Sequence, residues 1–207
     1  MILTNEDILV NLDKYPVGQD LKKLFIRRNP VHIEVGSGKG TFLVHQACQH
    51  PEVNYLGLEW ANKYYRYSVD RMRRRQITNV RILRTDARDF IRIYVPEGNV
   101  AGLHIYFPDP WPKKRHHKRR FFAPETIKQV ARILTVGGEF RTATDHADYF
   151  AVMQEVMLGD SEIATLFEET AFYPVDTADV GEWVGSNFER KYLKEGRKIY
   201  TLALRKK

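Results

Sequence analysis

The sequence contains one cysteine, Cys48, in 207 residues. A single thiol cannot form an internal disulfide, so a small secreted scaffold held by disulfides is excluded, as are zinc sites built from several cysteines. No apolar run approaches the roughly 20 residues that a transmembrane helix requires. The first residues also lack the basic and apolar regions of a signal peptide. We therefore expect a soluble protein of the reducing cytoplasm that does not contact a membrane.

The sequence also lacks internal repeats, low-complexity segments and linkers. Hydrophobic residues make up 43% of the chain and charged residues 29%, the composition of an ordinary folded protein. A chain of this length buries about 70% of its extended surface, which is enough for one core. We predict a single domain over residues 31–207, preceded by a short N-terminal segment over residues 1–30.

Acidic residues are too few to balance the basic ones. Lys and Arg number 33 against 26 Asp and Glu, which gives a formal net charge of +7. The excess is concentrated in two runs, Lys63–Arg75, with Asp70 as its only acid, and Lys113–Arg120, with none. One such run could simply solvate a surface. Two runs with tyrosines and a tryptophan nearby favour binding to nucleic acid or another polyanion.

Short apolar runs alternate with helix-length segments along most of the chain. This alternation is typical of an α/β fold with a parallel sheet covered by helices on both faces. Strands are predicted at Val31–Val35, Tyr55–Glu59, Val80–Leu83, Gly102–Phe107, Gly138–Ala143, Leu166–Thr170 and Ile199–Arg205. Helices are predicted at Thr41–Gln49, Ala61–Gln76, Pro124–Leu134 and His146–Leu158. Two irregular segments are predicted as well, a turn at Val136–Gly138 and a long loop at Phe172–Gly196.

A glycine-rich turn joins the first predicted strand to the first predicted helix. Glycine has no Cβ, so a ligand can approach the backbone and the helix N-terminus closely. A Walker loop is excluded because Ile33 stands where its first glycine is required, and a dinucleotide loop does not fit because Thr41 occupies its third glycine position. A tight turn without a ligand is one alternative. The other is motif I of the class I S-adenosylmethionine-dependent methyltransferases, which the pattern Glu-x-Gly-x-Gly-x-Gly resembles, formed by Glu34, Gly36, Gly38 and Gly40.

Acidic residues follow the second and third predicted strands. Glu59 closes the second strand, where a carboxylate can accept both hydroxyls of a ribose. Asp86 follows the third, where it can accept a hydrogen bond from an adenine amino group. Either residue alone could be a helix N-cap or a solvated strand end. Ligands of open α/β sheets bind at the carboxyl ends of strands, and an acidic pocket suits a cationic sulfonium. We therefore predict S-adenosylmethionine as the cofactor.

The fourth predicted strand ends in a proline-rich loop that runs directly into the second basic run. Prolines stiffen this loop, and Asp109 stands where a methyl acceptor must meet the sulfonium, although a rigid loop with a solvated acid is the alternative. The motif Pro-Asp-Pro-Trp-Pro-Lys-Lys-Arg-His resembles the signature of the bacterial tRNA (guanine-N7)-methyltransferases. Motifs of that family are also similar to Gly57–Trp60, Thr142–Asp145 and Ser186–Arg190, in the same order. Ser186 stands where the family commonly has threonine, and the hydroxyl is retained.

The resemblance implies a Rossmann-like class I methyltransferase fold. Its sheet would be seven-stranded and mostly parallel, with helices on both faces and an antiparallel C-terminal strand. The implied activity is transfer of a methyl group from S-adenosylmethionine to N7 of a guanine in the variable loop of tRNA, at position forty-six. Cofactor contacts are implied for Glu34, Gly36, Gly38, Gly40, Glu59, Asp86 and Asp109, of which Asp109 is also implied to be catalytic. Substrate contacts are implied for Lys113, Asp145, Ser186, Asn187, Phe188 and Glu189, and RNA contacts for Arg115, His116, His117, Lys118, Arg119 and Arg120.

Alternatives exist for the later residues and for the activity. Asp145 could be only a helix N-cap, Lys113 a surface lysine and Glu189 a partner for Arg190; as substrate residues, Asp145 or Glu189 would accept hydrogen bonds from guanine. The rival activities are methylation of an exocyclic amino group or of another RNA, and RNA binding without catalysis. No metal site is predicted, because two adjacent histidines without a third ligand do not make one. We expect tRNA as the partner and a monomer or homodimer, and the sequence gives no sign of an obligate protein partner.

Overall fold

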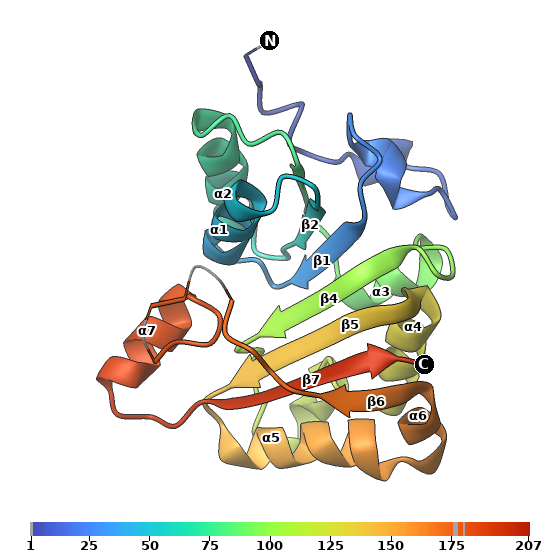
Figure 1. Ribbon diagram of the computed structural model, residues 1–207, viewed down its shortest axis with the longest axis vertical. Helices are drawn as coiled ribbons and strands as arrows, with labels where there is room; N and C mark the ends of the chain where they lie inside the picture. Colours follow the sequence, from blue (N-terminus) through green and yellow to red (C-terminus); the bar gives the residue numbers. More distant parts are fainter. Residues whose placement is uncertain (1, 176–177, 180) are drawn as a thin grey trace.

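The computed structural model describes residues 2–175, 178–179 and 181–207. Within these residues one seven-stranded sheet has the order β3-β2-β1-β4-β5-β7-β6 (Figure 1). The strands are β1 (Val31–Val35), β2 (Asn54–Leu58), β3 (Val80–Leu83), β4 (Val100–Tyr106), β5 (Leu134–Thr144), β6 (Phe167–Thr170) and β7 (Tyr200–Lys206). The pairs among β1 to β5 are parallel, whereas β7 is antiparallel to both β5 and β6. This topology confirms the predicted sheet with its antiparallel C-terminal strand.

Helices cover both faces of the sheet and bury a separate hydrophobic cluster on each. On one face, Phe42 and Leu43 of α1 and Met72 of α2 are almost fully buried in one cluster. On the other face, Phe90 of α3 and Ile127 of α4 are fully buried in the second cluster. The helix bounds are α1 (Thr41–Gln49), α2 (Asn62–Arg74), α3 (Ala87–Ile93), α4 (Pro124–Ile133), α5 (Ala147–Gln154), α6 (Ser161–Leu166) and α7 (Asn187–Lys194). None of these helices is long and apolar enough to cross a bilayer, among the residues that the structure describes.

The residues before β1 pack against the sheet. Ile8 and Val10 exchange backbone hydrogen bonds with Ile82 of β3, both at 2.9 Å. Ile8 and Leu21 are fully buried. Two short 3-10 helices, η1 (Leu12–Lys14) and η2 (Leu21–Leu24), complete this segment. It therefore covers the outer edge of β3, which would otherwise offer unpaired backbone groups to other chains.

The structure corrects the predictions in three places. The segment Phe172–Gly196 is not one long loop, because it contains α7; its residues 176, 177 and 180 lie outside the described residues. The predicted helix His146–Leu158 is α-helical only over α5 and continues as the π-helical turn η4 (Glu155–Gly159). The predicted turn at Val136–Gly138 lies inside β5. There the pairing shifts from Val100–Leu134 to Gly102–Glu139, so the residues between them bulge out of the ladder.

Candidate active site

The glycine-rich turn is held in shape by backbone and carboxylate hydrogen bonds at the end of β1. The amides of Gly36 and Ser37 donate to the carbonyl of Leu58 at 2.8 and 3.2 Å. Glu59 accepts from the amides of Gly38 and Ala61, both at 2.7 Å. These bonds fix the turn against the end of β2. Glycine is required here because Gly36 and Gly38 have φ angles of +73° and +53°.

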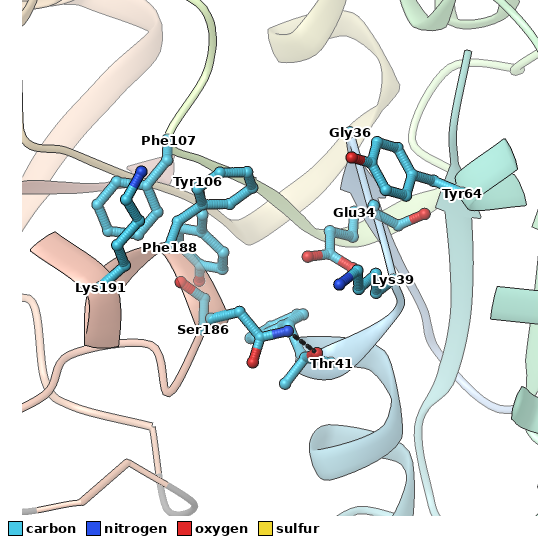
Figure 2. Close-up of a pocket in the computed structure, with 14 residues that line it drawn as sticks. Glu34, Gly36, Lys39, Thr41, Tyr64, Tyr106, Phe107, Ser186, Phe188 and Lys191 are labelled. Carbon is cyan, nitrogen blue, oxygen red and sulfur yellow. Dashed lines mark hydrogen bonds between the residues drawn. The ribbon is translucent and has the colours of Figure 1, made fainter. Parts of the chain in front are cut away.

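Two adjoining cavities open above this turn, at the carboxyl ends of β1 to β4. The first has a volume of about 300 Å³ and is lined by Glu34 and by the start of α7 (Figure 2). The second has a volume of about 440 Å³ and is lined by Glu59, Asp86 and Asp109. The residues common to both walls are Gly36, Gly38, Tyr64, Tyr106, Phe107 and Phe188. The structure thus brings together the four predicted acidic residues. Gly40 lies outside both cavities.

Gly40 acts in packing at this point of the turn. Its φ is +67°, and a Cβ added there would lie 2.8 Å from Met72 Cε and 3.1 Å from Ser68 Cβ of α2. The absence of a side chain therefore allows α2 to approach the start of α1. The sequence pattern predicts Gly40 as part of the cofactor turn; the structure has it in the turn, outside both cavities and packed against α2.

Glu34 is the most unusual group in the first cavity. Its side chain is 6% exposed, and Oε2 has no hydrogen-bond partner within the described part of the chain. Burial, together with the nearby charge of Glu59, raises the pKa of Glu34 well above its usual value of 4.5. A buried acceptor without a partner is costly in a folded protein. A cationic group bound in the cavity would satisfy it.

Asp86 both caps a helix and lines the second cavity. It is the N-cap of α3, and its Oδ1 accepts from the amide of Arg88 at 2.9 Å. Burial opposes ionisation, but the hydrogen bonds from the side chain and backbone of Arg88 outweigh it and lower the pKa of Asp86. The N-cap alternative and the binding-site alternative are therefore compatible, and the carboxylate is charged where it faces the cavity.

The proline-rich loop places Asp109 on the exposed side of the second cavity. Phe107 and Trp111, on either side of it, have φ angles of +52° and +44°, in the left-handed region that non-glycine residues rarely adopt. Such strain persists only where surrounding contacts hold it and is common at functional sites. Here Arg120 Nε donates to the carbonyl of Pro110 at 2.9 Å.

The second basic run forms a short 3-10 helix, η3 (Lys114–Arg119), beside this loop. The guanidinium of Arg119 lies 5.0 Å from the centre of the Trp111 ring, and both residues line the second cavity. Of the other members of the run, His116 and Arg120 are half-buried and the rest are exposed, all of them outside the two cavities. Lys113 is also exposed and lines neither cavity. The run is thus available to a large polyanion rather than to a small ligand.

The start of α7 forms one wall of the first cavity. Ser186 caps the helix through Oγ, which accepts from the amide of Glu189 at 3.0 Å. Asn187 Nδ2 donates to Thr41 Oγ1 of α1 at 3.0 Å. Phe188 is 55% exposed and lines both cavities. Three of the predicted substrate residues therefore surround one opening.

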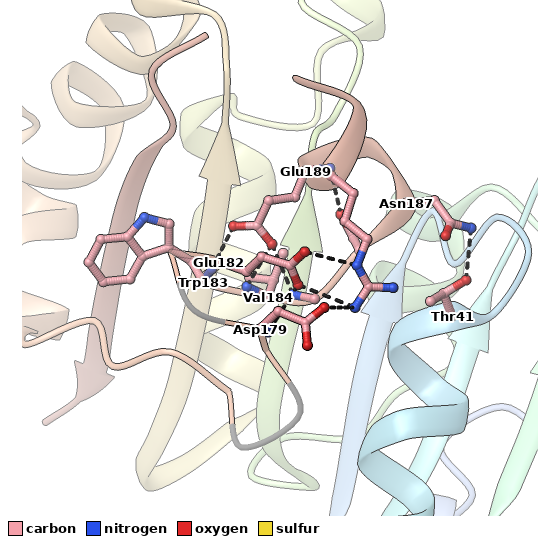
Figure 3. A network of polar contacts seen from close by, with 10 residues as sticks. Thr41, Asp179, Glu182, Trp183, Val184, Asn187 and Glu189 are labelled. Carbon is pink, nitrogen blue, oxygen red and sulfur yellow. Dashed lines mark hydrogen bonds and ion pairs between the residues drawn. The ribbon is translucent and has the colours of Figure 1, made fainter. Parts of the chain in front are cut away.

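Glu189 faces away from that opening. It is fully buried, and its two oxygens accept from the amides of Trp183 at 2.6 Å, Val184 at 3.0 Å and Gly185 at 2.9 Å (Figure 3). It therefore holds the loop before α7 and lines neither cavity. It is not the partner of Arg190 either, because Arg190 pairs with Glu182 at 2.8 Å.

Asp145 lies at the end of β5 and is held by Arg197. The distance from Asp145 Oδ2 to Arg197 Nη1 is 2.6 Å, and the Asp145 side chain is 14% exposed. The N-cap alternative for Asp145 is wrong, because His146 is the N-cap of α5. Asp145 lines neither of the two cavities.

Glu189→Gln should detach the loop before α7, because an amide NH₂ cannot accept from the backbone N–H groups that one carboxylate oxygen now serves. Hydrogen bonds to a charged group contribute roughly 1.5–3 kcal/mol each, so we expect a loss of about 2–3 kcal/mol in unfolding free energy or in the free energy of local opening. Urea denaturation and limited proteolysis of residues 172–186 measure this. Glu125→Gln, in the first turn of α4 and exposed, is the matched control. Equal behaviour of the two variants would contradict the anchoring role.

Sequence reasoning missed the aromatic walls of the cavities. Tyr106 lines both, and its hydroxyl contacts His104 Nδ1 at 2.9 Å, while His104 Nε2 contacts His32 Nδ1 at 3.0 Å. Burial lowers the pKa of His32 to about 4, so this chain of rings is uncharged at neutral pH and fixes Tyr106 by hydrogen bonding. The signal in the sequence was the alternation of polar residues in β1 and β4, which places these side chains on one face.

Two relatives with similar sequences carry the same name. A family model described as a putative methyltransferase matches residues 28–202. The chain is 37% identical over 198 residues to a tRNA (guanine-N(7)-)-methyltransferase of Alkalilimnicola ehrlichii, which covers 95% of this chain and 81% of the relative. It is 32% identical over 206 residues to a protein of the same name from Geobacter metallireducens, covering 100% of this chain and 96% of the relative.

Solved structures with a similar fold are methyltransferases of low sequence identity. An rRNA methylase from Streptococcus thermophilus has a TM-score of 0.55 at 13% identity, covering 86% of this chain and 87% of that one. A putative methyltransferase from Streptococcus mutans, solved in complex with SAH, has a TM-score of 0.56 at 11% identity, covering 86% and 89%. These likenesses confirm the class I methyltransferase fold.

Proposed function

This chain belongs to the tRNA (guanine-N(7)-)-methyltransferase family, and from this premise we propose that its two cavities hold S-adenosylmethionine and a guanine of tRNA. The activity is S-adenosylmethionine-dependent methyl transfer to N7 of guanine in tRNA. We infer from the resemblance that the target lies in the variable loop, at position forty-six. We also infer that the protein acts in the cytoplasm, as a monomer or homodimer without a second protein.

The observation that carries the proposal is the set of carboxylates at the ends of four neighbouring strands. Glu34 lines the first cavity, and Glu59, Asp86 and Asp109 line the adjoining second cavity, both beside the glycine turn. S-adenosylmethionine supplies a methyl group on a positively charged sulfur, and its amino acid end carries an ammonium. The unpartnered Oε2 of Glu34 fits that ammonium, since it is a buried acceptor in need of a cationic donor. Glu59 and Asp86 would bind the ribose hydroxyls and the adenine amino group.

The residues around the first cavity suit a nucleobase. Guanine N7 has an in-plane lone pair and no proton, so the site needs no general base. It must align N7 with the methyl carbon and sulfur, and such alignment can lower a barrier by about 7 kcal/mol or more. Phe188, exposed at the opening, would stack on the base. Of the two carboxylates predicted to accept from guanine, Glu189 is buried among backbone amides. Asp145 lies outside both cavities, so its assignment stays a proposal that requires its ion pair with Arg197 to open.

Asp109 is the residue that we propose as catalytic. During transfer, positive charge moves from sulfur to the imidazole ring of guanine. A carboxylate fixed at the end of β4 stabilises that charge more in the transition state than in the bound substrate, provided that its loop is rigid. The prolines and the strained Phe107 and Trp111 backbone supply this rigidity.

A methyl-transfer assay tests the proposed function. Labelled S-adenosylmethionine and an unmodified tRNA transcript are incubated with the purified chain alone, and the RNA is then cleaved by reduction and aniline treatment, which cuts at N7-methylguanine. We expect label in tRNA and cleavage at the variable-loop guanine. Label without cleavage would mean methylation of another atom, and no label with intact S-adenosylmethionine binding would contradict the tRNA substrate or the activity of the chain alone.

A further inference from the structure

The basic side chains of the first basic run, on α2, line neither of the two cavities described above. The run lines a third cavity of about 400 Å³ between the glycine turn, α2 and the start of α7. We call this the arginine cavity. Among the residues that the structure describes, four cationic side chains and no acidic one line it; the cations are Lys39, Arg71, Arg74 and Arg75.

The three arginines lie on one face of α2. Their spacing of three and four residues brings the guanidinium groups together, and like charges at this spacing repel. Asp70 pairs with Arg74 at 2.8 Å, on the flank of the cavity. Arg71 and Arg75 have no carboxylate partner in the part of the chain that the structure describes. Burial and the charge of Arg75 lower the pKa of Arg71, which is a second sign that positive charge is concentrated here. A bound anion would relieve this repulsion.

Hydrogen bonds hold the wall of the arginine cavity in place. Arg71 Nη1 donates to the carbonyl of Lys39 at 3.1 Å and to Thr41 Oγ1 at 2.9 Å. The same hydroxyl accepts from Asn187 of α7, a contact visible in Figure 3. Thr41 therefore joins α1, α2 and α7 at this point. An arginine whose plane is fixed loses little freedom when it binds a phosphate with its remaining N–H groups.

We propose that the arginine cavity binds a backbone phosphate of the substrate RNA next to the methylated nucleotide. This inference rests on the proposed function, because it takes the RNA chain to leave the first cavity. Lys39, Thr41 and Asn187 line both the first cavity and the arginine cavity, so the two are adjacent. A nucleotide whose base enters the first cavity has its phosphates within a few ångströms of the base-bearing sugar. The Arg119 side of the site would hold the RNA on the other flank.

Arg75→Gln tests the phosphate site, since Arg75 makes no structural hydrogen bond that the cofactor turn depends on. We expect its affinity for unmodified tRNA at about 0.1 M salt to fall roughly 10-fold, and the slope of log affinity against log salt to decrease by about one. Fluorescence anisotropy over a KCl series measures both. The matched control is Arg66→Gln, which removes the same charge from an exposed position of α2 outside the cavity. Unchanged S-adenosylmethionine affinity shows that the variant is folded.

Phosphate ethylation interference identifies the source of the phosphate. With the wild-type protein, we expect ethylation of one or two phosphates beside the target guanine to block tRNA binding. With Arg75→Gln, ethylation of the same phosphates should not weaken tRNA binding further. Equal tRNA binding by Arg75→Gln and Arg66→Gln would overturn the proposal. Loss of inorganic phosphate binding without loss of tRNA affinity would overturn it too, in favour of a small anion. If the wild-type protein binds tRNA with this interference pattern but transfers no methyl group, the result contradicts the proposed function and supports the phosphate site.

Discussion

Glu34→Gln should weaken S-adenosylmethionine binding about 100-fold while making the free protein more stable. Removing one partner of a buried charge pair costs roughly 2–5 kcal/mol, and a 100-fold change corresponds to about 2.7 kcal/mol. In the free protein, however, Oε2 of Glu34 is buried without a partner. The amide has nearly the same shape and carries no charge. One substitution therefore separates binding from stability.

The stability gain should depend on pH in a defined direction. The pKa of Glu34 is raised above its usual 4.5, so the folded state holds this proton more tightly than the unfolded state does. The contribution of Glu34 to stability is then fully present below pH 4.5 and is lost as the pH rises toward the raised value. The Glu34→Gln variant does not lose stability in this way. Its unfolding free energy should therefore exceed that of the wild type only slightly at pH 4.5, and the difference should grow toward pH 8.

Calorimetric titration with S-adenosylmethionine and urea denaturation at a series of pH values measure the two effects. Glu97→Gln, an exposed carboxylate in the loop before β4, should match the wild type in both. A Glu34→Gln variant that binds S-adenosylmethionine normally would show that the buried carboxylate does not contact the ammonium. A variant less stable than the wild type at pH 8 would contradict the raised pKa.

Asp109→Asn should slow the methyl-transfer step about 100-fold. Removal of one preorganised group that stabilises developing charge commonly costs 10²–10³ in rate, about 2.7–4 kcal/mol. The amide keeps the size and hydrogen-bonding reach of the side chain but loses its negative charge. Because Asp109 lies on the exposed side of the second cavity, we expect its loss to affect S-adenosylmethionine affinity less than tenfold.

Single-turnover kinetics with saturating tRNA isolate the chemical step from binding and product release. Asp148→Asn, in the first turn of α5 and exposed, controls for the loss of one charge at the same edge of the sheet. A near-normal single-turnover rate for Asp109→Asn would contradict charge stabilisation and leave Asp109 only a positioning role. A large loss of affinity with a normal rate would instead assign it to cofactor binding.

The sequence predicts the sheet well because its strands are short, apolar and separated by strong signals. β1 and β3 begin and end at the predicted residues, and the parallel order follows from the alternation with helices. The β5 bulge is different. Gly137 marks a left-handed residue in either a turn or a bulge, and only the pairing of Gly102 with Glu139 decides between them.

The helices that the sequence analysis missed are short ones with polar caps. The sequence offers Asp86 both as a ligand residue and as a helix N-cap, and the structure shows this carboxylate capping α3. Ser186 and Glu189 have the spacing of a capping box, a signal for the start of α7 that the Gly and Pro content of the segment obscured. In short elements, a cap and a ligand residue look the same in sequence.

Some features of the candidate site could be predicted from the sequence, and others depend on contacts between distant segments. The glycine turn is a local feature, and Glu34, Glu59 and Asp86 each lie at the end of a predicted strand, so the predicted parallel sheet places them at one edge. The role of Glu189 depends on the amides of residues 183–185, which donate hydrogen bonds to its carboxylate. The periodicity of the sequence does not predict this contact. The arginine cavity likewise needs α2 and α7 to meet at Thr41.

The measurement that tests the central claim most directly replaces the target guanine of a tRNA transcript by 7-deazaguanine, in which a C–H group stands in place of N7. The Watson–Crick edge and the backbone are unchanged, so the protein should bind this transcript as it binds the guanine transcript. We expect no methyl transfer to it at enzyme concentrations that fully methylate the guanine transcript. Transfer at a comparable rate would show that the methyl group goes to another atom and would contradict methylation at N7.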